Sequence, residues 1–129
     1  MLTCNLMGGL GNQLFQIFTT IAYALQLSQS FFFLNSHQLG NGENGSTIRY
    51  TYWDTFLDSL NIFLKNDNIK MLKVRETGFH YDKLPEHTAK DIMLSGYFQS
   101  YLYFDKYKNA IFKLIKIESK KSAIKQMVN

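Results

Sequence analysis

A glycine-rich stretch near the N-terminus holds the residue types best suited to binding a ligand. The stretch consists of Gly8, Gly9, Leu10, Gly11, Asn12 and Gln13. It follows a short apolar run and precedes apolar residues at helical spacing, so backbone N–H groups should lie at the positive end of a helix dipole, which suits phosphate or another anion. The glycines let a ligand approach the backbone closely, and the two side-chain amides add hydrogen-bonding groups.

The stretch differs from two common phosphate-binding motifs. A dinucleotide loop reads G-x-G-x-x-G, and Leu14 stands where its last glycine is required. The second apolar run ends at Asn35, where such a fold needs an acidic residue for the ribose. The G-x-x-x-x-G-K-[ST] pattern is absent as well. On spacing alone, a plain glycine turn between a strand and a helix remains an alternative.

A second cluster follows the apolar run at residues 92–94. It consists of Gly96, Tyr97, Phe98, Gln99 and Ser100. The carboxyl end of a strand is where open α/β sheets bind ligands, and an aromatic face beside an amide suits a sugar. The cluster therefore predicts ligand contacts from Tyr97 and Gln99. A packed corner between a strand and a helix is the alternative interpretation.

Composition indicates one globular domain, residues 1–129, with 46% hydrophobic and 19% charged residues. Its single cysteine, Cys4, excludes an internal disulfide, fits a reducing compartment and should be buried in the first strand. No run is long enough to span a membrane, and no secretory signal is present. The net charge of +4 comes mostly from late lysines at helical intervals, which predict a solvated face and no nucleic-acid partner.

The apolar pattern predicts an α/β fold. We expect a strand at residues 1–7, a helix at 14–28 and a strand at 31–34, which together form a βαβ unit with parallel strands. Residues 35–46 should be a loop, 54–64 a short helix, and 69–74 and 92–94 strands. Helices are expected at 101–117 and 118–128, with a break near Ile117. The chain then ends after a helix that should lead to a further strand.

No catalytic or metal-binding group stands out. The histidines His37, His80 and His87 are not at ligand spacing, and no Asp-x-Asp pair occurs, so no metal or other cofactor is expected. No G-x-S-x-G elbow marks a nucleophile. The catalytic residue is therefore unknown at this level. The candidate bases are Asp54, Asp58, Glu76, Asp82, Glu86 and Asp91.

Together the two clusters resemble the α-1,2-fucosyltransferases of glycosyltransferase family 11. The matching residues are 8–16 and 96–100, followed by Tyr103 and Phe104. The resemblance implies an inverting enzyme with a two-lobed, Rossmann-like (GT-B-type) architecture of parallel sheets with flanking helices. It implies transfer of L-fucose from GDP-fucose to the 2-hydroxyl of a galactose-type acceptor without a metal. The glycine loop and Asn12 would then face the cleft near the donor or the acceptor.

The chain departs from the family in one respect, because it lacks the GDP-fucose signature His-x-Arg-Arg-x-Asp. Its two arginines, Arg49 and Arg75, lie in other contexts. We therefore expect an N-terminal lobe whose complementing C-terminal, GDP-fucose-binding lobe lies outside this chain. The chain begins at its first strand, as cytoplasmic members of the family do. Two other interpretations stay open: a non-catalytic carbohydrate- or nucleotide-binding module, and a small α/β interaction domain.

Overall fold

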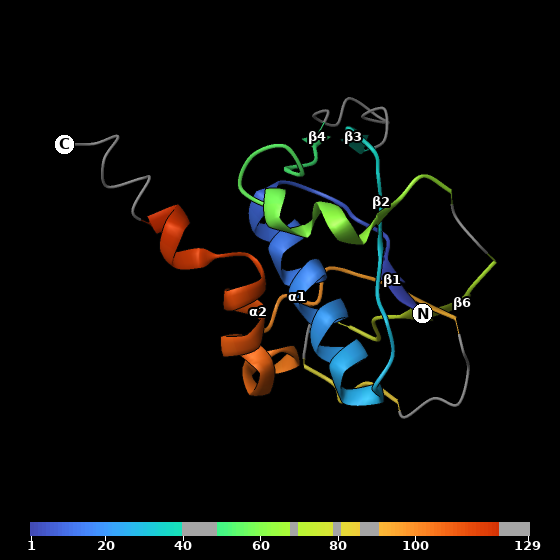
Figure 1. Ribbon diagram of the computed structural model, residues 1–129. Coiled ribbons are helices and arrows are strands. Elements are labelled where there is room, and N and C mark those ends of the chain that lie inside the picture. Colours follow the sequence, from blue (N-terminus) through green and yellow to red (C-terminus); the bar gives the residue numbers. More distant parts are fainter. Residues whose placement is uncertain (40–48, 68–69, 79–80, 86–90, 122–129) are drawn as a thin grey trace.

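Three parallel strands form the central sheet of a mixed α/β domain (Figure 1). The computed structural model describes residues 1–39, 49–67, 70–78, 81–85 and 91–121. The strands are β1 (Leu2–Cys4), β6 (Leu72–Arg75) and β7 (Ile92–Ser95), in the order β1-β7-β6. In the register, Leu2 and Leu72 both lie opposite Ile92. The parallel pairing follows from crossover connections between strands that run in the same direction.

The expected βαβ unit is confirmed. The helix α1 (Leu10–Leu27) follows β1, and Phe31 then forms a parallel bridge with Leu2. The chain continues into β2 (Phe33–Leu34), which pairs in parallel with β5 (Leu64–Lys65). β1 therefore has the segment before β2 on one side and β7 on the other. The chain leaves β1 toward one side of the sheet and later returns to the opposite side.

The core lies between the sheet and α1. Ile17 and Ile21 of the helix and Leu94 of β7 are fully buried there. A second helix, α2 (Lys108–Leu114), packs on α1, so that α1 lies between the sheet and α2 (Figure 1). The Phe18 ring of α1 meets Phe112 of α2 at 6.1 Å between centroids. Because the sheet covers one side of α1 and α2 covers another, residues 16–24 of α1 are all buried.

The helix α1 begins earlier than the apolar spacing predicts. Gly9 is its N-cap. The backbone N–H of Gln13 donates to the Gly9 carbonyl at 3.0 Å, which is the first hydrogen bond of the helix. The predicted start near Leu14 is therefore wrong, because Leu10 is the only apolar residue before Leu14 in the helix and one residue shows no helical spacing. At the other end, Ser28 takes the left-handed conformation (φ 55°), and its amide donates to carbonyls of the last turn.

Two other predictions are wrong in part. The segment 35–46, expected as a loop, contains β3 (Gln38–Leu39), which pairs antiparallel with β4 (Arg49–Tyr50); residues 40–46 lie outside the described part. Instead of an α-helix at 54–64 there is a turn followed by a 3₁₀ helix, η2 (Asp58–Phe63). Its polar residues favour local turns over a regular helix.

The C-terminal part is more broken than expected. The predicted helix 101–117 consists of two 3₁₀ turns, η3 (Tyr101–Tyr103) and η4 (Asp105–Tyr107), followed by α2. The Ser100 hydroxyl accepts from the Leu102 amide and starts the first turn. The predicted break is confirmed, and it falls at Lys116, which has φ 54°. Helix resumes at residues 117–121, and residues 122–128 of the last predicted helix lie outside the described part. The strand expected at 69–74 runs from Leu72 to Arg75.

Two predictions about the burial of side chains are confirmed for the residues that the structure describes. Cys4 lies in the core with 8% of its surface exposed, and burial raises the pKa of its thiol to about 12. It is an inert core residue at neutral pH. The late lysines that the structure describes lie at the surface, with Lys120 the most covered of them; Lys125 lies outside the described residues.

Lys120 ties the last helical turn to η2, because its ammonium donates to the Asp58 carboxylate. This hydrogen bond lowers the pKa of Asp58 from its ordinary value of 3.8. The folded state thus favours the charged carboxylate. Its contribution to stability is present above the ordinary pKa and is lost as the pH falls through the lowered value.

We predict two effects of Asp58→Asn. The variant should have a lower thermal unfolding temperature than the wild type at pH 7. Its unfolding temperature should also fall less than that of the wild type when the pH is lowered below the ordinary pKa of Asp58. Calorimetric scans between neutral and acidic pH measure both effects. Asp105→Asn is the control, because Asp105 pairs with Lys108 only within one turn at 3.6 Å. Equal acid sensitivity of the wild type and Asp58→Asn would contradict the prediction.

Candidate functional site

The carboxyl ends of the three central strands meet at one edge of the sheet, because the strands are parallel. At this edge the chain leaves β1 toward Phe31, while β7 lies on the opposite side of β1. The connections on the two sides of β1 thus run to opposite sides, and open α/β sheets bind ligands at such a point. The residues that follow β1 and β7 are the two clusters singled out in the sequence.

Two buried glutamines support the glycine loop. The Gln16 side-chain amide accepts from the Met7 N–H at 2.9 Å and donates to the Met7 carbonyl at 3.3 Å. Gln13 Nε2 donates to the carbonyls of Gly8 (3.0 Å) and Tyr50 (2.8 Å). Both side chains are fully buried. The structure thus places Gln13, which the sequence suggested as a ligand contact, beneath the loop as a support.

The glycine loop itself is short. Only Gly8 and Gly9 precede the helix, and Gly8 has φ +78°, which a residue with a side chain rarely adopts. A Cβ atom at Gly8 would also lie 2.7 Å from Asn12 Nδ2. Leu10 and Gly11 begin the first turn, which contains no acidic residue, and the N-cap residue Gly9 provides no side-chain cap. The N–H groups of that turn have no acceptor within the helix.

The structure brings the two sequence clusters together. Gln99 Nε2 donates to Asn12 Oδ1 at 2.6 Å, across 87 residues of sequence. Phe98 between Tyr97 and Gln99 is fully buried and has φ 52°, a left-handed conformation. The chain is thereby turned so that the side chains on both sides of Phe98 face outward, with Tyr97 41% exposed.

Both arginines of the chain lie at this edge, which the sequence did not indicate. Arg49 Nη1 lies 3.4 Å from the place that a Cβ atom on Gly9 would occupy. Arg49 belongs to β4, and the hydrogen bond from Gln13 to the Tyr50 carbonyl holds that strand against the helix. Arg75 ends β6 and lines a pocket together with Met7. One arginine thus lies beside the glycine loop, and the other lines the pocket that includes Met7, the residue before the loop.

The pocket at the ends of β6 and β7 has a volume of about 320 Å³. The residues that form most of its lining are Met7, Arg75, Glu76, Thr77, Gly96 and Tyr97. Glu76 Oε1 accepts from the Tyr97 N–H at 3.1 Å. Gly96, with φ +152°, lets the two strand ends come this close, because a Cβ atom there would lie 2.5 Å from Glu76 Cβ. Among the candidate bases that the structure describes, Glu76 is the one that lines this pocket.

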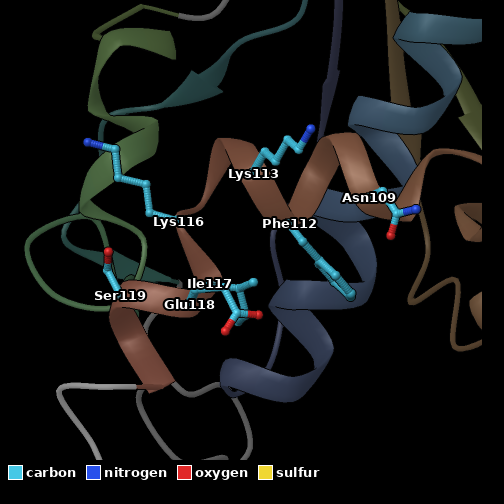
Figure 2. A pocket seen from close by; sticks show the side chains of 7 residues that line it. All are labelled: Asn109, Phe112, Lys113, Lys116, Ile117, Glu118 and Ser119. Carbon is cyan, nitrogen blue, oxygen red and sulfur yellow. The ribbon is translucent and has the colours of Figure 1, made fainter.

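A larger hollow of about 560 Å³ lies along α2 and the following helical turn (Figure 2). Lys113 and Lys116 project from one side of this segment, while Phe112 points toward α1 (Figure 2). None of the residues that the sequence singled out for binding lines this hollow. The sheet edge, where charged, amide and aromatic side chains converge, is therefore the candidate site.

Metal-ligating residues do not gather in the described part of the chain: no three His, Cys, Asp or Glu side chains are placed there to hold an ion. The His37 ring packs at 5.4 Å from the Tyr50 ring. His80 and His87 lie outside the described residues.

No protein-family model, curated protein or solved structure matches the chain. Across the described residues, the helices are too short or too polar for any of them to cross a membrane.

We predict that Gly96→Ala destabilises the fold by about 1–3 kcal/mol, because it adds a strained backbone conformation and a clash with Glu76. Gly11→Ala is the matched control, since nothing lies within 4 Å of a Cβ atom at that helical position. The control should be neutral or up to about 1 kcal/mol more stable, because alanine favours the helix. Urea unfolding of both variants tests this, and equal stabilities would contradict the close approach at Gly96.

Proposed function

We propose that this chain is the N-terminal lobe of a cytoplasmic fucosyltransferase that moves L-fucose from GDP-fucose to the 2-hydroxyl of a galactose-type acceptor. The hydrogen bond between Gln99 and Asn12 carries the proposal. It joins the two segments that resemble family 11 enzymes, at the place in the sheet where α/β proteins bind nucleotides and sugars. The placement of β1 between Phe31 and β7 also agrees with a Rossmann-like lobe of the GT-B type.

The charges at the edge fit a sugar diphosphate. The first turn of α1 has N–H groups that the N-cap residue Gly9 does not cap with a side chain, and the Arg49 guanidinium lies beside Gly9. Backbone N–H groups and a guanidinium can both donate to phosphate oxygens, the latter in bidentate fashion. The exposed Tyr97 ring and the Gln99 amide are suited to a sugar. This arrangement supplies charge and orientation without a metal ion.

The second candidate is a non-catalytic carbohydrate- or nucleotide-binding module. One observation favours it: two arginines lie at the candidate site, but the chain lacks the His-x-Arg-Arg-x-Asp run. A lobe that shares its donor site with a partner lobe should bind GDP-fucose weakly by itself. Submillimolar binding of GDP-fucose by this chain alone, measured by calorimetry, would favour the module.

We predict that Arg49→Ala weakens GDP-fucose binding about tenfold or more, because a hydrogen bond to a charged group contributes about 1.5–3 kcal/mol. An NMR titration of the labelled chain measures the affinity and shows whether the amides of Gly9, Gly11 and Asn12 shift. Lys113→Ala is the control, since it removes the same charge from the hollow along α2. Shifts confined to other residues, or equal losses in both variants, would refute the proposed donor site.

A transfer assay separates a lobe from a complete enzyme. We predict that this chain alone shows no fucosyl transfer above the rate without protein. The chain lacks the arginine pair of the family signature, which would bind the diphosphate. Radiolabelled GDP-fucose with a β-galactoside acceptor provides the measurement. Robust turnover would refute the assignment as a lobe. Recovery of a second polypeptide that restores transfer would support it.

A further inference from the structure

The pocket beside the glycine loop differs chemically from the loop itself. We infer that this pocket, at the ends of β6 and β7, binds an uncharged sugar ring, with the Glu76 carboxylate accepting a hydrogen bond from a sugar hydroxyl. The inference rests on the proposed function and deepens it, because it assigns the galactose-type acceptor to this pocket and the diphosphate to the glycine loop.

The Glu76 carboxylate is held in place by the backbone around it. The Glu76 N–H donates to the Ser95 carbonyl at 2.9 Å, and the Tyr97 N–H donates to Glu76 Oε1 at 3.1 Å. The structure gives Oε2 no partner among the described residues. An ionised carboxylate accepts through both oxygens. One oxygen thus orients the group, and the other remains to accept from a ligand.

The rest of the lining fits a neutral ligand with hydroxyl groups. Arg75 also lines the pocket, and its guanidinium carries hydrogen-bond donors for hydroxyl groups. Ser95 and Thr77 also line the pocket and carry hydroxyls; the Thr77 hydroxyl donates to the Asp82 carboxylate at 2.5 Å and can still accept a hydrogen bond. The Tyr97 ring is 41% exposed at the rim and offers an apolar face. The volume of about 320 Å³ lies at the lower end of the range of small-molecule sites, about 300–1,000 Å³.

The charges also decide which part of the substrates belongs here. A phosphate group in the pocket would lie against the Glu76 carboxylate, and like charges at close range repel each other. The first turn of α1, by contrast, has no acidic residue and has Arg49 beside it. The diphosphate therefore favours the loop and the uncharged sugar favours the pocket. The two sites adjoin each other, since Met7 of the pocket lining directly precedes Gly8.

The test is an NMR titration of the full labelled chain with methyl β-galactoside, repeated with Glu76→Gln. The amide group of glutamine keeps one oxygen for the Tyr97 N–H, so the fold should persist, but it replaces the second acceptor with a donor. We expect amide shifts at residues 75–77 and 95–97 and an affinity about tenfold or more lower in the variant. Asp105→Asn, which alters an exposed carboxylate at a distance from the pocket lining, is the matched control and should bind as the wild type does.

A second variant, Tyr97→Leu, keeps the backbone N–H that binds Glu76 and removes only the ring. It should also weaken galactoside binding and leave GDP-fucose binding at the glycine loop unchanged, so the test does not depend on Glu76→Gln alone. Unchanged galactoside affinity in both variants, shifts confined to other residues, or no galactoside binding would overturn the inference. The separate GDP-fucose titration distinguishes this result from failure of the proposed function, because it reports on Gly9, Gly11 and Asn12.

Discussion

The candidate site depends on the hydrogen bonds by which two buried glutamines hold the backbone between β1 and α1. Gln16 satisfies both polar groups of Met7, and Gln13 joins Gly8 to the carbonyl of Tyr50 in β4. A buried polar group without a partner costs about 1–3 kcal/mol, so these bonds favour one conformation of the loop over others. Gln13 Oε1 is itself buried and has no hydrogen-bond partner among the residues that the structure describes. The loop is thus maintained even though one buried acceptor stays unsatisfied.

The same bonds determine where charge lies. Gln13 holds β4 near α1, and Arg49 of that strand consequently lies beside Gly9. At the pocket, the register of β6 against β7 brings Glu76 to the Tyr97 N–H. The edge therefore has a positive part at the glycine loop and a part with charges of both signs, Arg75 and Glu76, in the pocket. A sugar diphosphate, which is negatively charged, would suit the positive part, and an uncharged sugar would suit the pocket.

Much of the fold was predictable because burial imposes a period on the sequence. The strand predicted at residues 92–94, which runs from Ile92 to Ser95, and the βαβ unit follow from apolar runs and helical spacing, and the burial of Cys4 follows from its place in the first strand. The predictions were wrong where packing, and not periodicity, decides the local structure. The aromatic segment after Ser100 forms 3₁₀ turns because Phe104 packs on Phe15 and Phe18, at 6.1 and 5.3 Å. The β3–β4 pair has only two residues in each strand, which is too short for an alternating pattern to reveal it.

The sequence by itself determined the two ligand-suited clusters, the α/β order of elements and the outward position of most late lysines, because these depend on residue type and local spacing. Only the tertiary structure decided that Gln99 reaches Asn12, that Arg49 lies beside Gly9 and that Glu76 stands apart from the other carboxylates. It also showed that Gln13 is a buried support. Each of these contacts joins segments that are distant in sequence or depends on burial. Strand order and helix packing create such contacts, and no local pattern of residues encodes them.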